Sequence, residues 1–241
     1  MAQQPLALVT GAAHRLGKVF VSALARNGYA ILLHYRNSGV DATSAAAEIK
    51  ALGVPVFLAQ ADLTEPAGIT ALFEYVDKIP HPLKVLVNSA AIMVAGEPRT
   101  FALRDWDEAL DLNLRAPFLC AQEAAKRMRE GGLIVNITDV GAQKAWSRYP
   151  AYAISKAGLG AMTSILARAF APGIRVNAIA PGLVLQSDLV SDEDWRRLVD
   201  RLPLKRPATV QEIASALEFL LKNQYVTGQT LVIDGGYSLL G

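Results

Sequence analysis

Two side chains near the middle of the chain have the types and the spacing needed for proton transfer. Tyr152 and Lys156 are four residues apart in the strongly helical stretch PAYAISKAGLGAM, so they share one helix face. A phenol is a poor acid or base near neutral pH unless a nearby ammonium group stabilises the phenolate. This spacing also occurs by chance between unrelated helix residues. What distinguishes the pair is Asp139, which stands thirteen residues before Tyr152, just past the apolar run GLIVNIT.

A glycine-containing turn follows the first apolar run of the chain. In LALVT-GAAHRLGK, Gly11 and Gly17 are six residues apart with Arg15 between them, so the strict G-x-G-x-x-G spacing is absent. If a helix starts here, its free N–H groups can bind a pyrophosphate at the carboxyl edge of a parallel sheet. A helix entry made only of small residues is the alternative interpretation.

The second apolar run ends in His34-Tyr35-Arg36-Asn37-Ser38, with no acid before Asp41. Enzymes that prefer NAD usually place a carboxylate here for the ribose 2′-hydroxyl, whereas a 2′-phosphate requires cationic and hydroxyl donors. Arg36 and Ser38, helped by His14 or Arg15, therefore favour NADPH. The alternative is that Arg36 is one more solvated loop arginine.

The composition excludes several classes of protein. The 241 residues carry 24 basic and 22 acidic side chains, without a basic stripe that would hold a nucleic-acid backbone, so we expect a small-molecule substrate as the partner. One cysteine, Cys120, and no zinc-ligand spacing favour a cytoplasmic protein without a structural metal. No apolar stretch approaches the 18 residues of a membrane span, so no membrane partner is expected.

Short apolar runs alternate with segments of helical period, which predicts an α/β fold: a single-domain, Rossmann-like, doubly wound parallel sheet of about seven strands with helices on both faces. The expected strands are 6–10, 30–35, 55–61, 84–90, 132–138, 175–180 and 230–234. The expected helices lie near 16–27, 41–52, 67–78, 104–129, 150–170 and 209–222.

Some helix ends can be predicted from the sequence. The helix at 41–52 is expected to start at Asp41 or Thr43, and Thr209 with Glu212 has the spacing of a capping box.

The segment 183–206 interrupts the alternation of apolar runs and helical segments, because it mixes apolar residues with charges of both signs. We expect either a surface helix or a lid over a site there. No linker divides the chain, so 1–241 is expected to be one domain.

The ordered set of motifs resembles the short-chain dehydrogenase/reductase family from end to end. Its members here are the glycine turn at 10–17, Asp62, Asn88-Ser89-Ala90, Asn113 in LNL, Tyr152 with Lys156, RVNAIAPG at 175–182 and VTGQTLVIDGGYS at 226–238. The resemblance implies that Tyr152 donates or accepts the proton, that Lys156 lowers its pKa and holds the nicotinamide ribose, and that Asn113 supports a proton-relay water. It also implies homo-tetramers or dimers.

The resemblance also implies an NADPH site. Its expected residues are Gly11, His14, Arg15, Leu16, Gly17, Tyr35, Arg36, Asn37, Ser38, Asp62, Leu63, Asn88, Tyr152, Lys156, Pro181 and Gly182. Within that set, Gly11 and Gly17 are expected at the phosphates, Asp62 at the adenine, and Asn88 as a support of the site.

The departures from the family pattern point to a substrate. Arg15 replaces a glycine, Ser89 an asparagine, Leu185 a threonine, and Asp139 the usual catalytic serine. An ionised carboxylate only accepts hydrogen bonds and would repel the developing charge on a carbonyl oxygen. Asp139 suits a substrate with N–H donors or a ring nitrogen that takes a proton, and the alternative is that Asp139 is itself kept protonated. TGAAHRLG, LHYRNS and this aspartate are similar to pteridine reductases and dihydromonapterin (dihydrofolate) reductases.

Expected substrate residues are Arg15, Met93, Asp139, Trp146 and Leu185. In the pteridine branch an aromatic side chain stacks on the ring where this chain has Met93, so Trp146 or Trp195 would have to supply that face. Two alternatives remain open: a 3-oxoacyl-acyl-carrier-protein reductase, which a serine at 139 would have favoured, and a non-catalytic NADP(H) sensor.

Overall fold

The computed structural model describes residues 3–144, 146–187 and 190–240. Seven parallel strands form one sheet in the order β3-β2-β1-β4-β5-β6-β7. The chain reverses its direction of winding between β1 and β4, which confirms the predicted doubly wound α/β fold. The strands are β1 (Leu6–Val9), β2 (Ala30–Tyr35), β3 (Val56–Gln60), β4 (Leu83–Asn88), β5 (Gly132–Ile137), β6 (Ile174–Pro181) and β7 (Thr230–Ile233).

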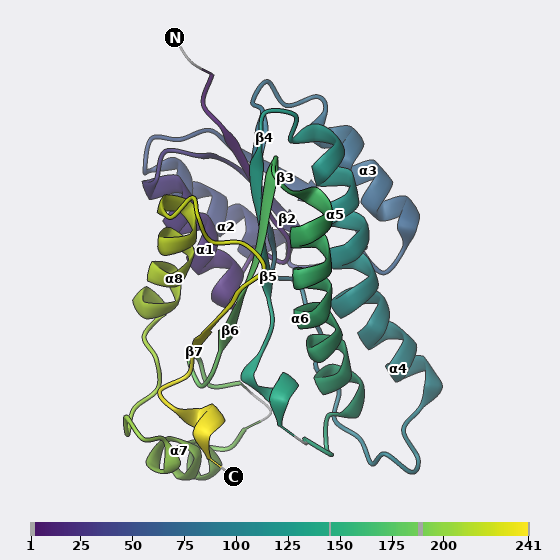
Figure 1. The fold of residues 1–241 in the computed structure, drawn as a ribbon, viewed down its shortest axis with the longest axis vertical. Coiled ribbons are helices and arrows are strands. Elements are labelled where there is room, and N and C mark those ends of the chain that lie inside the picture. The colour runs from purple at the N-terminus through teal and green to yellow at the C-terminus, as the bar shows by residue number, and fades with distance from the viewer. Residues whose placement is uncertain (1–2, 145, 188–189, 241) are drawn as a thin grey trace.

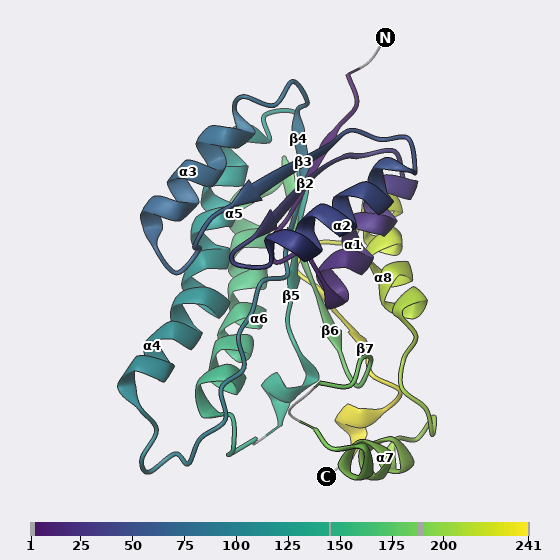
Figure 2. The ribbon, with the colours of Figure 1, turned by 180° about the vertical axis from the view of Figure 1, so that it is seen from behind.

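Helices cover both faces of the sheet (Figures 1 and 2). One face carries α3 (Pro66–Val76), α4 (Leu103–Leu110), α5 (Ala116–Arg127) and α6 (Pro150–Phe170), and the other carries α1 (Arg15–Arg26), α2 (Gly39–Lys50) and α8 (Val210–Lys222). Strand β1 is buried along its whole length because side chains on both of its faces meet a helix layer. Each helix layer packs on the sheet through its own apolar core, and the carboxyl edge of the sheet points away from the N-terminus (Figure 1).

The predicted helix at 104–129 is confirmed as a nearly continuous helical rod with one irregular turn. A π-helical segment, Asp111–Arg115, separates α4 from α5 and holds the buried Asn113. Such single wide turns change the direction of side chains within a helix and are frequent at functional sites. The hydrophobic period of the sequence gives no signal for this wider turn.

The predicted helix ends are partly confirmed. At α8 the Thr209 side chain accepts a hydrogen bond from the Glu212 N–H, and the Glu212 carboxylate accepts one from the Thr209 N–H, so the capping box forms. The start predicted for α2 was wrong, because the helix begins at Gly39. Asp41 lies inside its first turn, where a carboxylate is favourable through the helix dipole, so it marked the turn rather than the cap.

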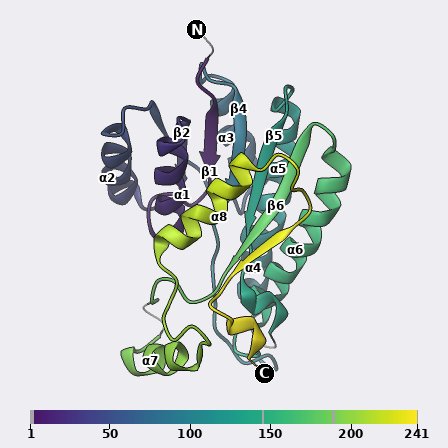
Figure 3. The ribbon, with the colours of Figure 1, turned by 60° about the vertical axis from the view of Figure 1, so that its left-hand side comes forward.

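The segment 183–206 contains a surface helix that also bounds a cavity. Helix α7 (Asp192–Arg201) begins after Ser191, whose hydroxyl accepts a hydrogen bond from the Asp194 N–H. In Figure 3 it lies beyond the carboxyl ends of the strands, close to the C-terminal turn η3 (Tyr237–Leu239). Positions 188 and 189 of this segment lie outside the described residues. None of the helices in the described part of the chain is long and apolar enough to span a bilayer.

Candidate active site

A cavity of about 950 Å³ lies along the carboxyl edge of the sheet. Its lining begins in the turn after β1, continues through the ends of β2, β4, β5 and β6, and includes α7. The point where strand order reverses, between β1 and β4, opens into it. This is the place where open α/β sheets bind their ligands.

Most residues singled out in the sequence line this cavity. They are Gly11, His14, Arg15, Leu16, Gly17, Tyr35, Arg36, Asn37, Ser38, Leu63, Met93, Asp139, Trp146, Tyr152, Lys156, Pro181, Gly182 and Leu185. Three others are not part of its lining: Asn88 and Asn113 are buried, and Asp62 is partly exposed beside Arg36. The sequence therefore located the cavity, although the roles of the individual residues remain predictions.

The glycine turn after β1 is shaped by close backbone approaches. Gly11 has φ of +62°, and a Cβ there would stand 2.8 Å from the Ala90 Cα. A Cβ on Gly17 would lie 2.1 Å from the Gly11 carbonyl oxygen, so this glycine is required by the folding of the turn itself. No side chain caps the first turn of α1, and that turn contains no acid. The N–H groups at this helix start suit an anionic group such as a pyrophosphate.

His34 holds the glycine turn in place through a hydrogen bond to Gly11, a role that the sequence analysis missed. Its Nε2 donates to the Ala61 carbonyl at 3.1 Å, and its Nδ1 accepts the Gly11 N–H at 3.2 Å. Burial lowers the pKa of His34 to about 4, against the opposing effects of Ala61 and Asp62, so the ring is neutral at physiological pH. A neutral ring is required, because only a neutral imidazole has an acceptor nitrogen for Gly11.

Thr10 joins the ends of the two strands at the reversal point. Its hydroxyl oxygen accepts hydrogen bonds from the backbone N–H groups of Ser89 at 3.0 Å and Ala90 at 3.1 Å. The hydroxyl thus ties the end of β1 to the segment after β4. The only sequence signal was a polar residue at the end of an apolar strand.

Arg36 at the end of β2 is surrounded by carboxylates. Its Nε lies 2.9 Å from Oδ2 of Asp62, and its Nη1 lies 3.5 Å from Oε1 of Glu108 on α4. Asp62 is itself held through Oδ1 by the backbone N–H and the hydroxyl of Thr64. Burial opposes ionisation of Asp62, but the Thr64 hydrogen bonds and the Arg36 charge outweigh it and keep its pKa below the usual value. The sequence analysis did not anticipate Glu108.

Arg15 bridges the glycine turn and the segment after β6. Its guanidinium donates to the carbonyl oxygens of Leu185 at 2.9 Å and Gln186 at 3.1 Å. Arg15 has φ of +50°, in the left-handed region that the usual glycine would adopt without strain. The arginine that replaces this glycine thus holds the two walls of the cavity together.

The catalytic candidates meet at the other end of the cavity. The Tyr152 hydroxyl donates to Oδ2 of Asp139 at 2.9 Å, and Oδ1 of Asp139 accepts the Gly141 N–H at 2.6 Å. The Lys156 ammonium donates to the Ile137 carbonyl at 2.6 Å and lies 5.7 Å from the centre of the Tyr152 ring. The helical spacing of Tyr152 and Lys156 therefore places both beside the end of β5, as expected.

Burial is the largest cause of the pKa shifts of these three groups. It raises the pKa of Asp139 despite opposing hydrogen bonds from Gly141 and Tyr152, and it raises the pKa of Tyr152 together with the Asp139 charge. It lowers the pKa of Lys156 to about 8, while the Asp139 charge acts in the opposite direction. A carboxyl group with a raised pKa next to a phenol is a pair that can pass one proton.

Comparisons with known proteins agree with this geometry. Residues 11–238 match the family model described as enoyl-(acyl carrier protein) reductase, which belongs to the short-chain dehydrogenases/reductases. The chain belongs to the short-chain dehydrogenase/reductase family. It is 34% identical over 237 residues to the 3-oxoacyl-acyl-carrier-protein reductase FabG of Staphylococcus aureus, covering 95% of this chain and 96% of that protein.

Two solved structures extend the comparison. FolM alternative dihydrofolate reductase 1 from Brucella suis, crystallised with NADP, has a TM-score of 0.93 and 33% identity, covering 99% of this chain and 96% of that one. A blue fluorescent protein from a metagenomic library, crystallised with NADPH, has a TM-score of 0.91 and 34% identity, covering 98% of both chains. This short-chain dehydrogenase/reductase is thus an oxidoreductase whose substrate the relatives leave open.

Two asparagines that the family pattern assigns to the site lie in its supporting structure. Asn113 in the π segment accepts the Ile92 N–H and donates to both the Ile92 carbonyl and the Ser155 hydroxyl, at 2.8 to 3.1 Å. Both amide hydrogens are thus engaged, which leaves the side chain only acceptor capacity for a water. Asn88 donates to Oδ1 of Asn136 at 2.9 Å inside the sheet, so it braces β4 against β5.

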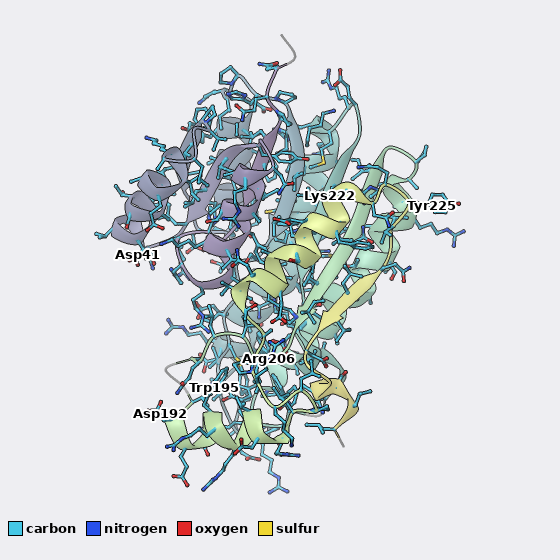
Figure 4. The ribbon with its side chains drawn as sticks, turned by 90° about the vertical axis from the view of Figure 1, so that its left-hand side faces the viewer. Asp41, Asp192, Trp195, Arg206, Lys222 and Tyr225 are labelled. Carbon is cyan, nitrogen blue, oxygen red and sulfur yellow. The ribbon has the colours of Figure 1, made fainter. Side chains whose placement is uncertain are left out.

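Aromatic side chains line the substrate end of the cavity. Trp146 lies 6.4 Å, between ring centres, from both Tyr149 and Tyr237, and both Trp146 and Met93 line the cavity wall. Trp195, labelled in Figure 4 on the side of α7 toward the rest of the protein, lines it too. The sequence analysis missed Tyr149 and Tyr237. Within the described chain, no cluster of three or more His, Cys, Asp or Glu side chains is placed to bind a metal.

Proposed function

We propose that this protein is an NADPH-dependent reductase of a C=N bond in a heterocycle, a pteridine or dihydrofolate. The observation that carries the proposal is the position of Asp139, hydrogen-bonded to Tyr152 at the end of β5 where the family usually has serine. Supporting it are the aromatic lining beside that pair and the likeness to a FolM dihydrofolate reductase crystallised with NADP.

The residues present fit a dinucleotide. The uncapped start of α1 and the close-packed Gly11 turn would hold the pyrophosphate, and Arg36 with Ser38 would hold the 2′-phosphate. Lys156 would hold the nicotinamide ribose, and Pro181 and Gly182 would border the ring. When bound there, NADPH supplies the hydride for reduction of the substrate.

The chain's own residues handle the proton. Asp139, whose pKa burial raises, delivers the proton from its carboxyl oxygen to the ring nitrogen of the substrate. Tyr152 then replaces that proton along the 2.9 Å hydrogen bond and takes a proton from solvent before the next turnover. The ammonium of Lys156, 5.7 Å from the centre of the phenol ring, stabilises the negative charge that this transfer leaves on Tyr152.

The second candidate is a 3-oxoacyl-acyl-carrier-protein reductase, which the 34% identity to the Staphylococcus aureus enzyme favours. For that reaction Tyr152 would protonate a carbonyl oxygen directly. A proton on Asp139 has an acceptor in a ring nitrogen, whereas the ionised form of Asp139 would repel the charge that develops on a carbonyl oxygen, and this is why we rank the heterocycle first.

The experiment is a steady-state assay of NADPH oxidation with dihydrobiopterin, dihydrofolate and an acetoacetyl thioester, using the wild type and Asp139→Ser. We expect the wild type to reduce a pterin or folate, and the serine variant to lose about 100-fold or more of that activity, since a general acid contributes at least that factor. Asp139→Asn is the control, because it keeps the shape of the side chain and removes the acidic group. Turnover of the thioester alone by the wild type would contradict the proposal.

A further inference from the structure

The ion-pair cluster at the end of β2 carries an inference about cofactor choice, which rests on the proposed use of NADPH. Within Tyr35, Arg36, Asn37 and Ser38, Arg36 is the only charged side chain, so it is the main cation offered to a 2′-phosphate at this strand end. It faces two carboxylates, Asp62 at 2.9 Å and Glu108 at 3.5 Å. A bound phosphate would compete with both for one guanidinium.

The two carboxylates are held differently. Asp62 is fixed by the backbone N–H of Thr64 at 2.9 Å and by its hydroxyl at 2.7 Å, and it uses its other oxygen for Arg36. Glu108 comes from α4 on the far side of the cluster, and its described contact is the single long one to Arg36. Asp62 therefore stabilises the loop after β3 through its hydrogen bonds to Thr64, whereas Glu108 adds negative charge and has no such contact with that loop.

We infer that Glu108 is a specificity-determining residue that weakens binding of the 2′-phosphate and so limits the preference for NADPH over NADH. The three side chains are partly exposed, at 43% for Arg36, 36% for Asp62 and 30% for Glu108, so solvent screens the interaction. Glu108 acts on the cofactor through Arg36. The cluster as it stands carries one positive and two negative charges.

The test replaces Glu108 by glutamine and measures dissociation constants of NADPH and NADH directly, by titration of the dinucleotide fluorescence without substrate. The ratio of the NADH constant to the NADPH constant should rise about two- to fivefold, the range expected for a screened surface charge. Raising the salt from about 0.05 M to 0.5 M should reduce this gain, because screening shortens the reach of the removed charge.

Two matched variants test whether Glu108 acts on the cofactor through Arg36. Asp107→Asn removes the same charge from the neighbouring, exposed position of α4 and should leave the ratio unchanged. In an Arg36→Ala background, Glu108→Gln should no longer alter the ratio, because the coupling passes through Arg36. An equal gain in Asp107→Asn, or a gain that persists without Arg36, would overturn the inference.

A fall in the ratio for Glu108→Gln would also overturn it, since it would mean that Glu108 orients Arg36 toward the phosphate. The proposed function fails separately: if the wild type binds neither dinucleotide, its NADPH-dependent part is wrong. Binding of NADPH without turnover of any pterin would leave the inference about Glu108 intact, because the titration needs no substrate.

Discussion

The hydroxyl of Tyr152 donates a 2.9 Å hydrogen bond to Oδ2 of Asp139, so the two proton-bearing groups of the site form one unit. Asp139 is fixed in turn by the backbone N–H of Gly141, and Tyr152 by its place on α6. Groups this close titrate as a pair, and a change in one alters the pKa of the other. The first two predictions follow from this coupling.

Replacing Tyr152 by Phe should leave NADPH binding nearly unchanged and lower kcat by about 10² to 10⁴, the contribution of a general acid. The phenyl ring keeps the shape of the cavity wall, and only the donor to Asp139 is lost. Dinucleotide fluorescence titration and steady-state turnover measure the two effects. Loss of binding together with turnover would favour a structural role and the NADP(H) sensor.

Turnover should fall as pH rises through about 8. Burial lowers the pKa of Lys156 to about 8, so below that pH the ammonium is present to stabilise the phenolate, and above it the amine is neutral. In Asp139→Asn the inflection should move to lower pH, because the Asp139 carboxylate raises the pKa of Lys156. The pH profile of kcat measures this shift.

Lys156→Arg is the control for the fall in kcat at alkaline pH. A guanidinium stays charged over this range, so the fall should be absent in this variant. If the fall in kcat above pH 8 were absent in Asp139→Asn, rather than moved to lower pH, it would come from the Asp139 carboxyl. The assignment to Lys156 would then be wrong.

The sequence predicted the parts of the site that depend on local spacing. Tyr152 and Lys156 share a helix face because they are four residues apart, and the Thr209 capping box was readable because its two hydrogen bonds are reciprocal. The isolated Asp41 misled the prediction of the start of α2, since a lone acid suits either a cap or a first turn.

What the sequence could not provide was pairing between distant segments. Glu108 is 72 positions from Arg36, and Leu185 is 170 positions from Arg15. Tyr237 reaches the cavity from the last turn of the chain. Each contact depends on how the helix layers and the late segment pack on the sheet, so no periodicity in the sequence predicts it.

His34 should make the protein sensitive to acid. Its pKa falls from 6.5 to about 4 on folding, so the stabilisation from the neutral ring is complete above pH 6.5 and is lost as pH falls toward 4. The resulting loss in the free energy of unfolding is about 3 kcal/mol across that window. Urea unfolding of the wild type and His34→Gln at pH 7 and about pH 4.5 measures it, with the variant expected to show a smaller loss.

His81→Gln is the matched control for this prediction, because it removes another histidine that bonds a backbone carbonyl, away from the glycine turn. It leaves the hydrogen bond from Gly11 to His34 in place, so the acid sensitivity assigned to His34 should persist in this variant. Carboxylates whose pKa lies below the usual value, such as Asp77 and Glu123, also lose stabilisation in acid, so the comparison is between variants. An identical loss in His34→Gln and the wild type would contradict the role assigned to the neutral ring.

Arg15 should control how firmly the segment after β6 is held. Its two hydrogen bonds to Leu185 and Gln186 join that segment to the glycine turn, and its φ of +50° is one that glycine adopts freely. Arg15→Gly should therefore change the free energy of unfolding little, since relief of strain offsets the added freedom of the unfolded chain. The expected loss is local: trypsin should cleave within 183–206 several-fold faster, and KM for the substrate should rise more than kcat falls.

Arg15→Lys keeps the charge but not the planar guanidinium, so its cleavage rate and KM should lie between those of the wild type and Arg15→Gly. Unchanged cleavage in Arg15→Gly would mean that other contacts hold the segment, because the variant removes both hydrogen bonds without requiring the turn to refold.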